Sequence, residues 1–324
     1  MSGLKIGFWD NELGLRGTTL AMYNYAKYNE IVLGNTSYIF ASTGRDMITR
    51  PRFEEQFPGR VFLCNSEKYF YTLATDPGLD YLHIQKFGSN EGIVMPDPKC
   101  LIHTVFCVNE PHGHKYTFIS DWLAGHMGYS PREDYSVPYI VEPLPEVDTD
   151  LRDELNIPRT ATVFGCYAGA TEFNISFVRY AMEKTVTERN DIYFILMNIE
   201  ANKNGHILDH PQIKFLPGNP DFHFKARLVK SCDAMIHARE GGETFGLAVA
   251  EFSTANKPVL TYALSGEACH LELLGEKALL YTNFDEVYDM FNNLSAYVKY
   301  EDYNCYRWFT PENVMARFQK VYLD

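Results

Sequence analysis

The sequence of 324 residues contains no long apolar run and no cluster of basic residues. No segment reaches the roughly 18 consecutive apolar residues of a membrane-spanning helix, and the first ten residues lack an apolar stretch of signal-peptide length. Lysine and arginine number 29 against 42 aspartates and glutamates, which gives a net charge of −13. The acidic balance argues against nucleic acid or an anionic membrane as partner, and together these absences predict a cytoplasmic protein.

Cysteine offers no sign of cross-links or metal ligation. The seven cysteines are odd in number and widely scattered, and Cys100 and Cys107 are among the closest neighbours. This spacing fits neither a disulfide framework nor the paired ligands of a zinc site. We interpret most of the cysteines as small buried hydrophobic residues in a reducing compartment, and we expect no metal.

Apolar and aromatic residues are abundant, at 46% and 15% of the chain, which is enough for two packed cores. The length also exceeds that of a usual single domain, so two domains are expected. Short apolar runs alternate with helical patterns from end to end, as is typical of an α/β protein. Predicted strands include residues 4–8, 100–105, 139–141, 162–167, 192–197, 234–237 and 258–262.

A proline-rich, acidic stretch at 143–148 predicts a linker between two α/β halves. We place an N-terminal Rossmann-like domain at 1–146 and a second one at 147–305, with a terminal helix in 306–324 that packs back toward the first. The predicted fold class is α/β, with two doubly wound domains facing a central cleft. In such sheets ligands bind beyond the carboxyl ends of the strands, so we expect the functional residues in the loops that follow strands.

The most informative segment is 233–260, whose pattern predicts a strand, a glycine-containing loop, a helix and another strand. Its glycines permit close backbone approach and positive φ. The string FGL at 245–247 opens the helix, whose first N–H groups have no partner within the helix. Together with the helix dipole, these groups predict an anion site suited to a diphosphate.

Two carboxylates of this segment, Glu243 and Glu251, stand eight residues apart, and ionised carboxylates bind hydroxyl groups strongly. The segment resembles the retaining GT-B glycosyltransferases of the group-1, family 4-like superfamily. Their hallmark is Glu-x7-Glu in a Glu-x-Phe-Gly-Leu context before a Pro-Val strand, which ETFGL at 243–247, Glu251 and PV at 258–259 match. The resemblance implies that Glu243 contacts the sugar, that Glu251 contacts the ribose, and that the sugar and phosphates lie against Phe245, Gly246 and Leu247.

The resemblance extends into the first half. The loop ending in Gly17 and Thr18 resembles the glycine loop that approaches the donor phosphate, although Thr18 or Thr19 serves equally well as a helix N-cap. His103 ends an apolar strand and resembles a histidine that touches the donor sugar; the alternative is a core histidine bonded to a carbonyl. The strings RGT at 16–18 and HAREGGETFGL at 237–247 also resemble those of uncharacterised group-1 transferases of viruses and bacteria.

The chain departs from this family after the first strand of the second domain. Family members carry an arginine there and a lysine about six residues on, which neutralise the leaving diphosphate, whereas this chain has Cys166 and Glu172. The same loop contains Gly169, which the resemblance places at the donor. Loss of the cations removes a large electrostatic contribution, and Arg239 is our predicted catalytic cation. The replacements considered are Arg239, Arg16, Lys225 and Arg227.

Two motifs carry the letters of a metal site but are interpreted as structural. Asp148 and Asp150 form an Asp-x-Asp in the linker, where capping of a short helix is expected instead. Glu110, His112 and His114 offer a possible ligand pair without an evident third ligand, which favours a simple turn.

Taken together, the resemblance implies a metal-independent, retaining glycosyltransferase. It would move a sugar from a nucleotide-sugar donor, a UDP- or GDP-sugar, to a glycan or other hydroxyl acceptor. Two alternatives stay open: a non-catalytic nucleotide-sugar-binding protein, which the missing cations favour, and a DNA-base glycosyltransferase, which the net charge of −13 disfavours. The donor base, the acceptor and the oligomeric state are not encoded in any recognised motif.

Overall fold

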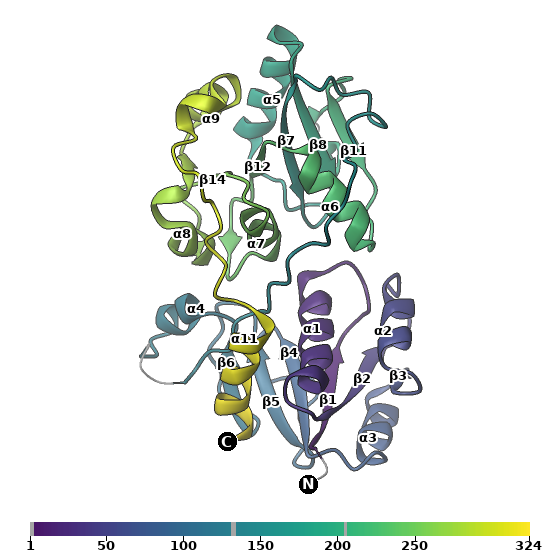
Figure 1. The fold of residues 1–324 in the computed structure, drawn as a ribbon. Helices are drawn as coiled ribbons and strands as arrows, with labels where there is room; N and C mark the ends of the chain where they lie inside the picture. Colours follow the sequence, from purple (N-terminus) through teal and green to yellow (C-terminus); the bar gives the residue numbers. More distant parts are fainter. Residues whose placement is uncertain (1–2, 131–133, 204–205) are drawn as a thin grey trace. The chain divides into compact units, whose positions relative to one another are not determined.

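The computed structural model describes residues 3–130, 134–203 and 206–324, and the chain divides into two compact units. Unit 1 comprises Met1–Ile140 and Trp308–Asp324, so both ends of the chain lie in it (Figure 1). Unit 2 comprises Val141–Arg307. Each unit contains a six-stranded parallel sheet with helices packed against it. No helix among the described residues is long and apolar enough to cross a membrane.

The elements of unit 1 alternate between strand and helix. Its strands are β1 (Lys5–Asp10), β2 (Thr36–Ser42), β3 (Val61–Cys64), β4 (Tyr81–Lys86), β5 (Lys99–Thr104) and β6 (Lys115–Phe118). Its helices are α1 (Gly17–Ile31), α2 (Arg50–Gln56), α3 (Glu67–Thr75), α4 (Asp121–His126) and α11 (Pro311–Phe318), followed by the π-helical turn η2 (Gln319–Leu323).

Unit 2 repeats this alternation. Its main strands are β7 (Thr162–Tyr167), β8 (Ile192–Met197), β11 (Ile213–Leu216), β12 (Ala234–His237), β14 (Val259–Tyr262) and β16 (Leu279–Tyr281). Two short strand pairs join β9 (Asn202–Lys203) to β10 (His206–Ile207) and β13 (Gly242–Glu243) to β15 (Glu267–Ala268). The helices are α5 (Ser176–Glu188), α6 (Phe222–Ser231), α7 (Leu247–Thr254), α8 (Cys269–Leu274), η1 (Gly275–Lys277), α9 (Phe284–Asn292) and α10 (Leu294–Tyr297).

Both six-stranded sheets follow one topology. The spatial order is β3-β2-β1-β4-β5-β6 in unit 1 and β11-β8-β7-β12-β14-β16 in unit 2. Each is the doubly wound order in which the first strand lies beside the fourth, and the chain changes direction across the sheet at that point. The α/β, Rossmann-like prediction is therefore confirmed. The switch points lie between β1 and β4 and between β7 and β12, where the following loops diverge.

One predicted strand is absent from the structure. The strand predicted at 139–141 is wrong, because these residues form no strand in the described chain. Their side chains are nonetheless buried, which explains the apolar run. Strand β16 pairs with β14 and completes the sheet of unit 2.

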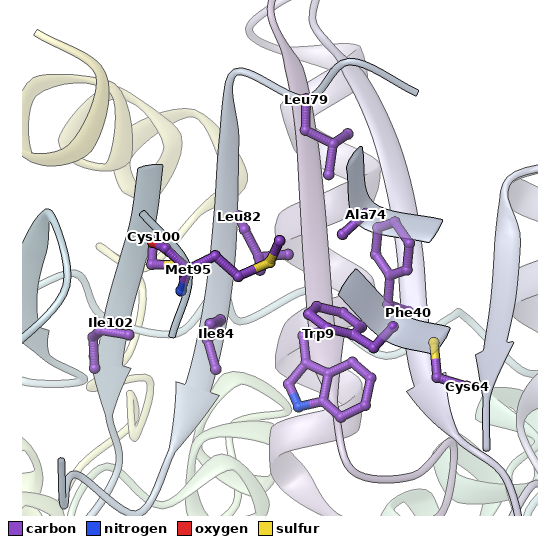
Figure 2. Packing of buried hydrophobic residues seen from close by; sticks show 11 residues of the cluster. Trp9, Phe40, Cys64, Ala74, Leu79, Leu82, Ile84, Met95, Cys100 and Ile102 are labelled. Atoms are coloured by element: carbon purple, nitrogen blue, oxygen red, sulfur yellow. Dashed lines mark hydrogen bonds between the residues drawn. The ribbon is translucent and has the colours of Figure 1, made fainter. Parts of the chain in front are cut away.

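One face of the unit 1 sheet carries a buried apolar cluster centred on Trp9 and Phe40. Because strand side chains alternate between faces, Trp9 points to this face and its neighbour Phe8 to the other. Figure 2 shows Met95 extending toward Leu82 within the cluster. Helix α3 covers this face, since its Phe70 ring lies 4.7 Å from that of Trp9.

The opposite face of this sheet is covered by α1 and by the end of the chain. The Phe318 ring of α11 lies 6.4 Å from Phe8, and Tyr322 of η2 packs against His83 at 5.6 Å. Arg317 then donates to the carbonyl of Ser136 at 2.8 Å and to the carboxylate of Asp121 at 3.2 Å. The last turns thus supply part of the core of unit 1.

Candidate functional site

The switch point of unit 2 is bridged by an ion pair. Glu172 lies in the loop after β7, and Arg239 lies in the loop after β12. Arg239 Nε approaches Glu172 Oε2 at 2.7 Å. Since ligands of doubly wound sheets bind where the loops of the first and fourth strands part, this pair marks the candidate site.

Glu243 lies at the same place because β13 holds its backbone against β15. Its Oε2 accepts from Arg239 Nη1 at 3.0 Å, and its Oε1 lies 3.3 Å from His237 Nε2. Burial alone would raise the pKa of Glu243, but the His237 hydrogen bond and the charge of Arg239 outweigh it and hold the pKa at about 2. About a fifth of the Glu243 side chain is exposed, so an ionised carboxylate faces solvent here.

Arg239 is a fixed cation. Burial disfavours its charge, but Glu243, Glu172 and Glu267 together raise the pKa of the guanidinium above its usual value. A quarter of the Arg239 side chain is exposed. It therefore stands charged and accessible beside Glu243, held from two sides by carboxylates.

The start of α7 adjoins this pair. Gly246 caps the helix with φ of 88°, the left-handed conformation that favours glycine. At Gly242, with φ of 79°, an added Cβ would lie 2.0 Å from the carbonyl oxygen of Glu267, so only glycine fits beneath the β13–β15 pair. The start of α7 follows directly, and the first N–H groups of a helix have no partner within the helix.

Phe245 and Leu247 flank that glycine in different environments. The Phe245 ring is buried at 1% exposure, and its carbonyl accepts from the Tyr306 hydroxyl at 3.1 Å. Phe245 therefore anchors the loop in the core, and its aromatic face is not presented to a ligand. Leu247 is half-buried at the first position of α7.

Glu251 lies one turn into α7 and is buried. Its carboxylate accepts a hydrogen bond from the Tyr167 hydroxyl and lies 3.0 and 3.1 Å from Lys225 Nζ. Lys225 extends from α6, and Tyr167 ends β7. The carboxylate is thus oriented by two partners, the Tyr167 hydroxyl and the Lys225 ammonium.

The structure separates the four cations that could replace the missing pair. Arg227 is turned to Glu154 and to the carbonyl of Asp150. Arg16 lies in unit 1 and pairs with Glu12 at 3.0 Å. Arg239 and Lys225 remain beside the candidate carboxylates. Cys166 is buried within β7, while Gly169 is exposed in the loop that follows.

In unit 1 the corresponding switch point holds Gly17 and Thr18. Gly17 is exposed at the first position of α1, and the backbone carbonyl of Thr18 accepts from Gln85 of β4 at 3.3 Å. The N-cap alternative for Thr18 is wrong, because Arg16 is the N-cap residue and no side chain caps the helix. The neighbouring Thr19 hydroxyl donates instead to Asp10 Oδ2 at 2.9 Å.

Asp10 is a buried carboxylate at this switch point, and sequence reasoning did not single it out. It ends β1 and is buried at 5% exposure. Desolvation raises the pKa of Asp10 to about 6, against hydrogen bonds from Thr19, Asn11 and Thr18 that favour the ionised form. Only its place at the end of the first strand could have pointed to it.

We expect the stability of unit 1 to fall by about 2 kcal/mol between pH 4 and pH 7 on account of Asp10. The unfolded carboxyl ionises near pH 3.8, whereas the folded one holds its proton until about pH 6, so the unfolded state binds fewer protons across this window. Urea unfolding followed by tryptophan fluorescence measures this, because Trp9, Trp122 and Trp308 all belong to unit 1. D10N should flatten the dependence, and D76N at an exposed position should not; equal slopes in D10N and wild type would contradict the assignment.

His103 lies in the core. It is completely buried, its Nδ1 lies 3.1 Å from His83 Nε2, and its Nε2 lies 2.9 Å from the carbonyl of Val137. Burial lowers the pKa of His103 to about 3, so the ring is neutral and donates to that carbonyl. Of the two alternatives for this residue, the structure shows the core histidine bonded to a carbonyl.

The two metal-like motifs are occupied by protein partners. Asp150 accepts from the backbone of Arg152 at 2.9 Å and from Arg159 Nη1 at 2.7 Å. His112 contacts the carbonyl of Glu110 at 2.6 Å and Lys86 Nζ at 3.1 Å. Within residues 3–130, 134–203 and 206–324, no group of three or more histidine, cysteine or acidic residues is arranged to hold a metal ion.

Solved structures share this architecture over almost the whole chain. The Anabaena protein HepE in complex with UDP-glucose matches with a TM-score of 0.66 and 14% identity, over 98% of this chain and 95% of HepE. A glycosyltransferase from Rickettsia africae matches with a TM-score of 0.62 and 14% identity, over 99% and 94% of the two chains. This chain has the GT-B fold.

The GT-B fold does not by itself choose a reaction. A proposed UDP-N-acetylglucosamine 2-epimerase from Listeria monocytogenes also matches, with a TM-score of 0.59 and 11% identity over 98% of this chain and 95% of that one. No protein-family model matches the chain, and no curated protein sequence does. The chemistry of the site residues, and not the fold, therefore has to indicate the reaction.

Three contacts within this GT-B fold were not anticipated. Glu172 orients Arg239, Lys225 pairs with Glu251, and His237 binds Glu243. The first two join residues far apart in sequence, and only the strand order brings them together. A signal for the third was present, since His237, the first residue of the HAR string, ends the strand that precedes Glu243.

Proposed function

We propose that this chain is a glycosyltransferase that takes a sugar from a nucleotide-sugar donor and passes it to a hydroxyl acceptor. One observation carries the proposal: Glu243, Arg239 and the start of α7 lie together at the switch point of unit 2. This combination offers a carboxylate for sugar hydroxyls beside a cation and free amides for a diphosphate.

The proposed roles follow the charges. Glu243, held ionised, accepts from hydroxyls of the sugar, and Glu251 accepts from those of the ribose. As the bond between the sugar C1 and the phosphate oxygen breaks, the electron pair leaves with the diphosphate. Arg239 and the amides of α7 stabilise that growing negative charge. Gly17 and Thr18, at the start of α1, and Gly169, in the loop after β7, are also proposed to contact the donor, and unit 1 is proposed to bind the acceptor.

We further propose that the transfer retains the anomeric configuration and needs no metal. The acceptor oxygen attacks C1 from the face that the diphosphate leaves, and the acceptor proton passes to the leaving phosphate oxygen. With Arg239 as the cation, charge neutralisation requires no divalent ion. The protein contributes positioning and electrostatic stabilisation.

The test is release of nucleoside diphosphate from a panel of UDP-, GDP-, ADP- and TDP-sugars. UDP-glucose is the first donor to try, since HepE was solved with it. We expect release from one donor, undiminished by EDTA and lost in Glu243→Ala. NMR analysis of the product then separates transfer with retention from inversion and from isomerisation of the sugar.

Each contrary result has a defined meaning. Donor binding without turnover, whatever acceptor is offered, would identify a non-catalytic nucleotide-sugar-binding protein. Loss of release in EDTA would overturn metal independence. Absence of both binding and release would remove the donor-site assignment altogether.

A further inference from the structure

A buried chain of hydrogen bonds runs inward from Glu243. Its Oε1 lies 3.3 Å from His237 Nε2, and His237 Nδ1 lies 2.9 Å from Thr261 Oγ1. Thr261 Oγ1 in turn lies 3.0 Å from His270 Nε2. The three inner residues come from β12, β14 and α8, and none of them is exposed by more than 4%. Such polar groups are costly to bury unless each finds a partner.

The protons of this chain have one arrangement that satisfies every contact with neutral rings. An ionised carboxylate only accepts, so His237 carries its proton on Nε2 and points it at Glu243. His237 Nδ1 must then accept the single hydroxyl proton of Thr261. The Thr261 oxygen is left to accept from His270 Nε2. Every donor therefore points toward Glu243, and the chain has a direction.

Glu243 is also faced by groups that do not belong to the chain. Arg239 approaches it from the loop after β12, and Arg239 is itself held by Glu172 and faced by Glu267. Two neutral groups, the Cys166 thiol of β7 and the Tyr306 hydroxyl, also lie within its electrostatic reach. Arg239 supplies charge, whereas only the inner chain supplies a directed donor from the protein interior.

We infer that Thr261 and His270 are positioning residues that fix His237 as a donor and thereby hold the Glu243 carboxylate toward the donor sugar. The inference rests on the proposed function of Glu243 as the sugar-binding carboxylate. Neither Thr261 nor His270 reaches solvent, so each acts through His237 and not by contact with a substrate. A hydroxyl is required at 261 because that atom donates to one ring and accepts from the other.

The activity test compares two substitutions at one position in the full-length chain. Thr261→Val keeps the shape but removes the hydroxyl, and Thr261→Ser keeps the hydroxyl but removes a methyl group. We expect T261V to lower kcat/KM for donor turnover about tenfold, as loss of one charge-supporting hydrogen bond does, and T261S to stay within about threefold of wild type. Equal losses in T261V and T261S would overturn the inference, since packing alone would then explain both.

The second test reads the proton arrangement without any activity. Long-range ¹H–¹⁵N spectra of the imidazoles, assigned with His237→Asn and His270→Asn, report which ring nitrogen carries the proton. We expect Nε2–H on both rings in the wild type. In Glu243→Ala the carboxylate acceptor is gone, and we expect both rings to switch to Nδ1–H as the hydroxyl of Thr261 turns round. A wild-type His270 without Nε2–H, or one unmoved by E243A, would overturn the chain.

The two tests keep the inference separate from the proposed function. If wild-type protein turns over no nucleotide-sugar, the proposed function fails, yet the spectra still decide whether the directed chain exists. If turnover is found but the tautomers do not change in E243A, the proposed glycosyltransferase function is retained and the positioning role of Thr261 and His270 is rejected.

Discussion

Replacing Arg239 with alanine is expected to lower the rate of nucleotide release by about 10²–10³-fold. The loops after β7 and β12 carry one cation, Arg239, against three carboxylates, and Glu172 and Glu243 are the two that pair with it. Without the guanidinium, a diphosphate would meet these acidic groups and the amides of α7 alone. The negative charge that develops on the leaving group would then lose its main counter-charge.

If Arg239 is the counter-charge, the proposed site needs neither the arginine nor the lysine that the family resemblance leads us to expect. Glu172 stands near the position expected for the lysine, so the charge there is reversed. That carboxylate draws Arg239 across the switch point at 2.7 Å, and the guanidinium fills the same region from the opposite loop. Glu172→Ala should therefore impair release less than R239A does, because it leaves the cation present but no longer held.

A matched control is available on α6. Arg227 belongs to the same unit, but it is turned to Glu154 and a backbone carbonyl, away from Glu243. R227A should leave the rate of release within about threefold of wild type, whereas R239K should recover part of the loss in R239A. An R239A rate within threefold of wild type would rule out Arg239 as the counter-charge and leave Lys225 as the remaining candidate.

Much of the fold could be predicted from the sequence because its signals are local. The alternation of apolar runs with helical patterns predicts two doubly wound sheets, and the FGL string at 245–247 predicts the start of α7. The run at 139–141 was misread for a physical reason, since a buried extended segment and a strand share one apolar pattern. The pattern records burial and does not record pairing.

The site was less predictable because its contacts join distant parts of the chain. Lys225 and Glu251 meet only because α6 and α7 flank neighbouring strands of the sheet. His103 shows the same difficulty for a single residue, because a histidine at the end of a strand can face a ligand or the core. Its ring packs in a cluster of aromatic side chains that includes Tyr322, near the end of the chain, and this contact places it in the core. Neither partner lies within the reach of a local motif.

The second large effect is expected at Glu251, where stability and binding should separate. Removing Glu251 by substitution with alanine leaves the Lys225 ammonium largely buried and unpaired, which destabilises unit 2 by about 3–5 kcal/mol. The double variant K225M/E251L removes both charges and keeps similar volume, so it should recover most of this loss. It should stay about 1–3 kcal/mol below wild type, because the buried Tyr167 hydroxyl loses its Glu251 acceptor.

Recovered stability should not bring recovered binding. The proposed ribose contact needs the carboxylate, so K225M/E251L should bind nucleoside diphosphate at least about tenfold more weakly than wild type. Lys225 and Tyr167 already take three of the roughly four acceptor positions of Glu251. A ribose hydroxyl bound to Glu251 would therefore use the remaining acceptor position, and a second hydroxyl would compete with Lys225.

Far-UV circular dichroism and calorimetric titration measure the two effects, and tryptophan fluorescence supplies an internal standard. All three tryptophans lie in unit 1, so their unfolding transition should not move in any Glu251 variant. Glu154→Ala, which breaks the more exposed pair with Arg227 on the same helix, should cost less than about 1 kcal/mol. Wild-type affinity in K225M/E251L would show that Glu251 serves the fold alone, and the donor would then be held by Glu243, Arg239 and the start of α7.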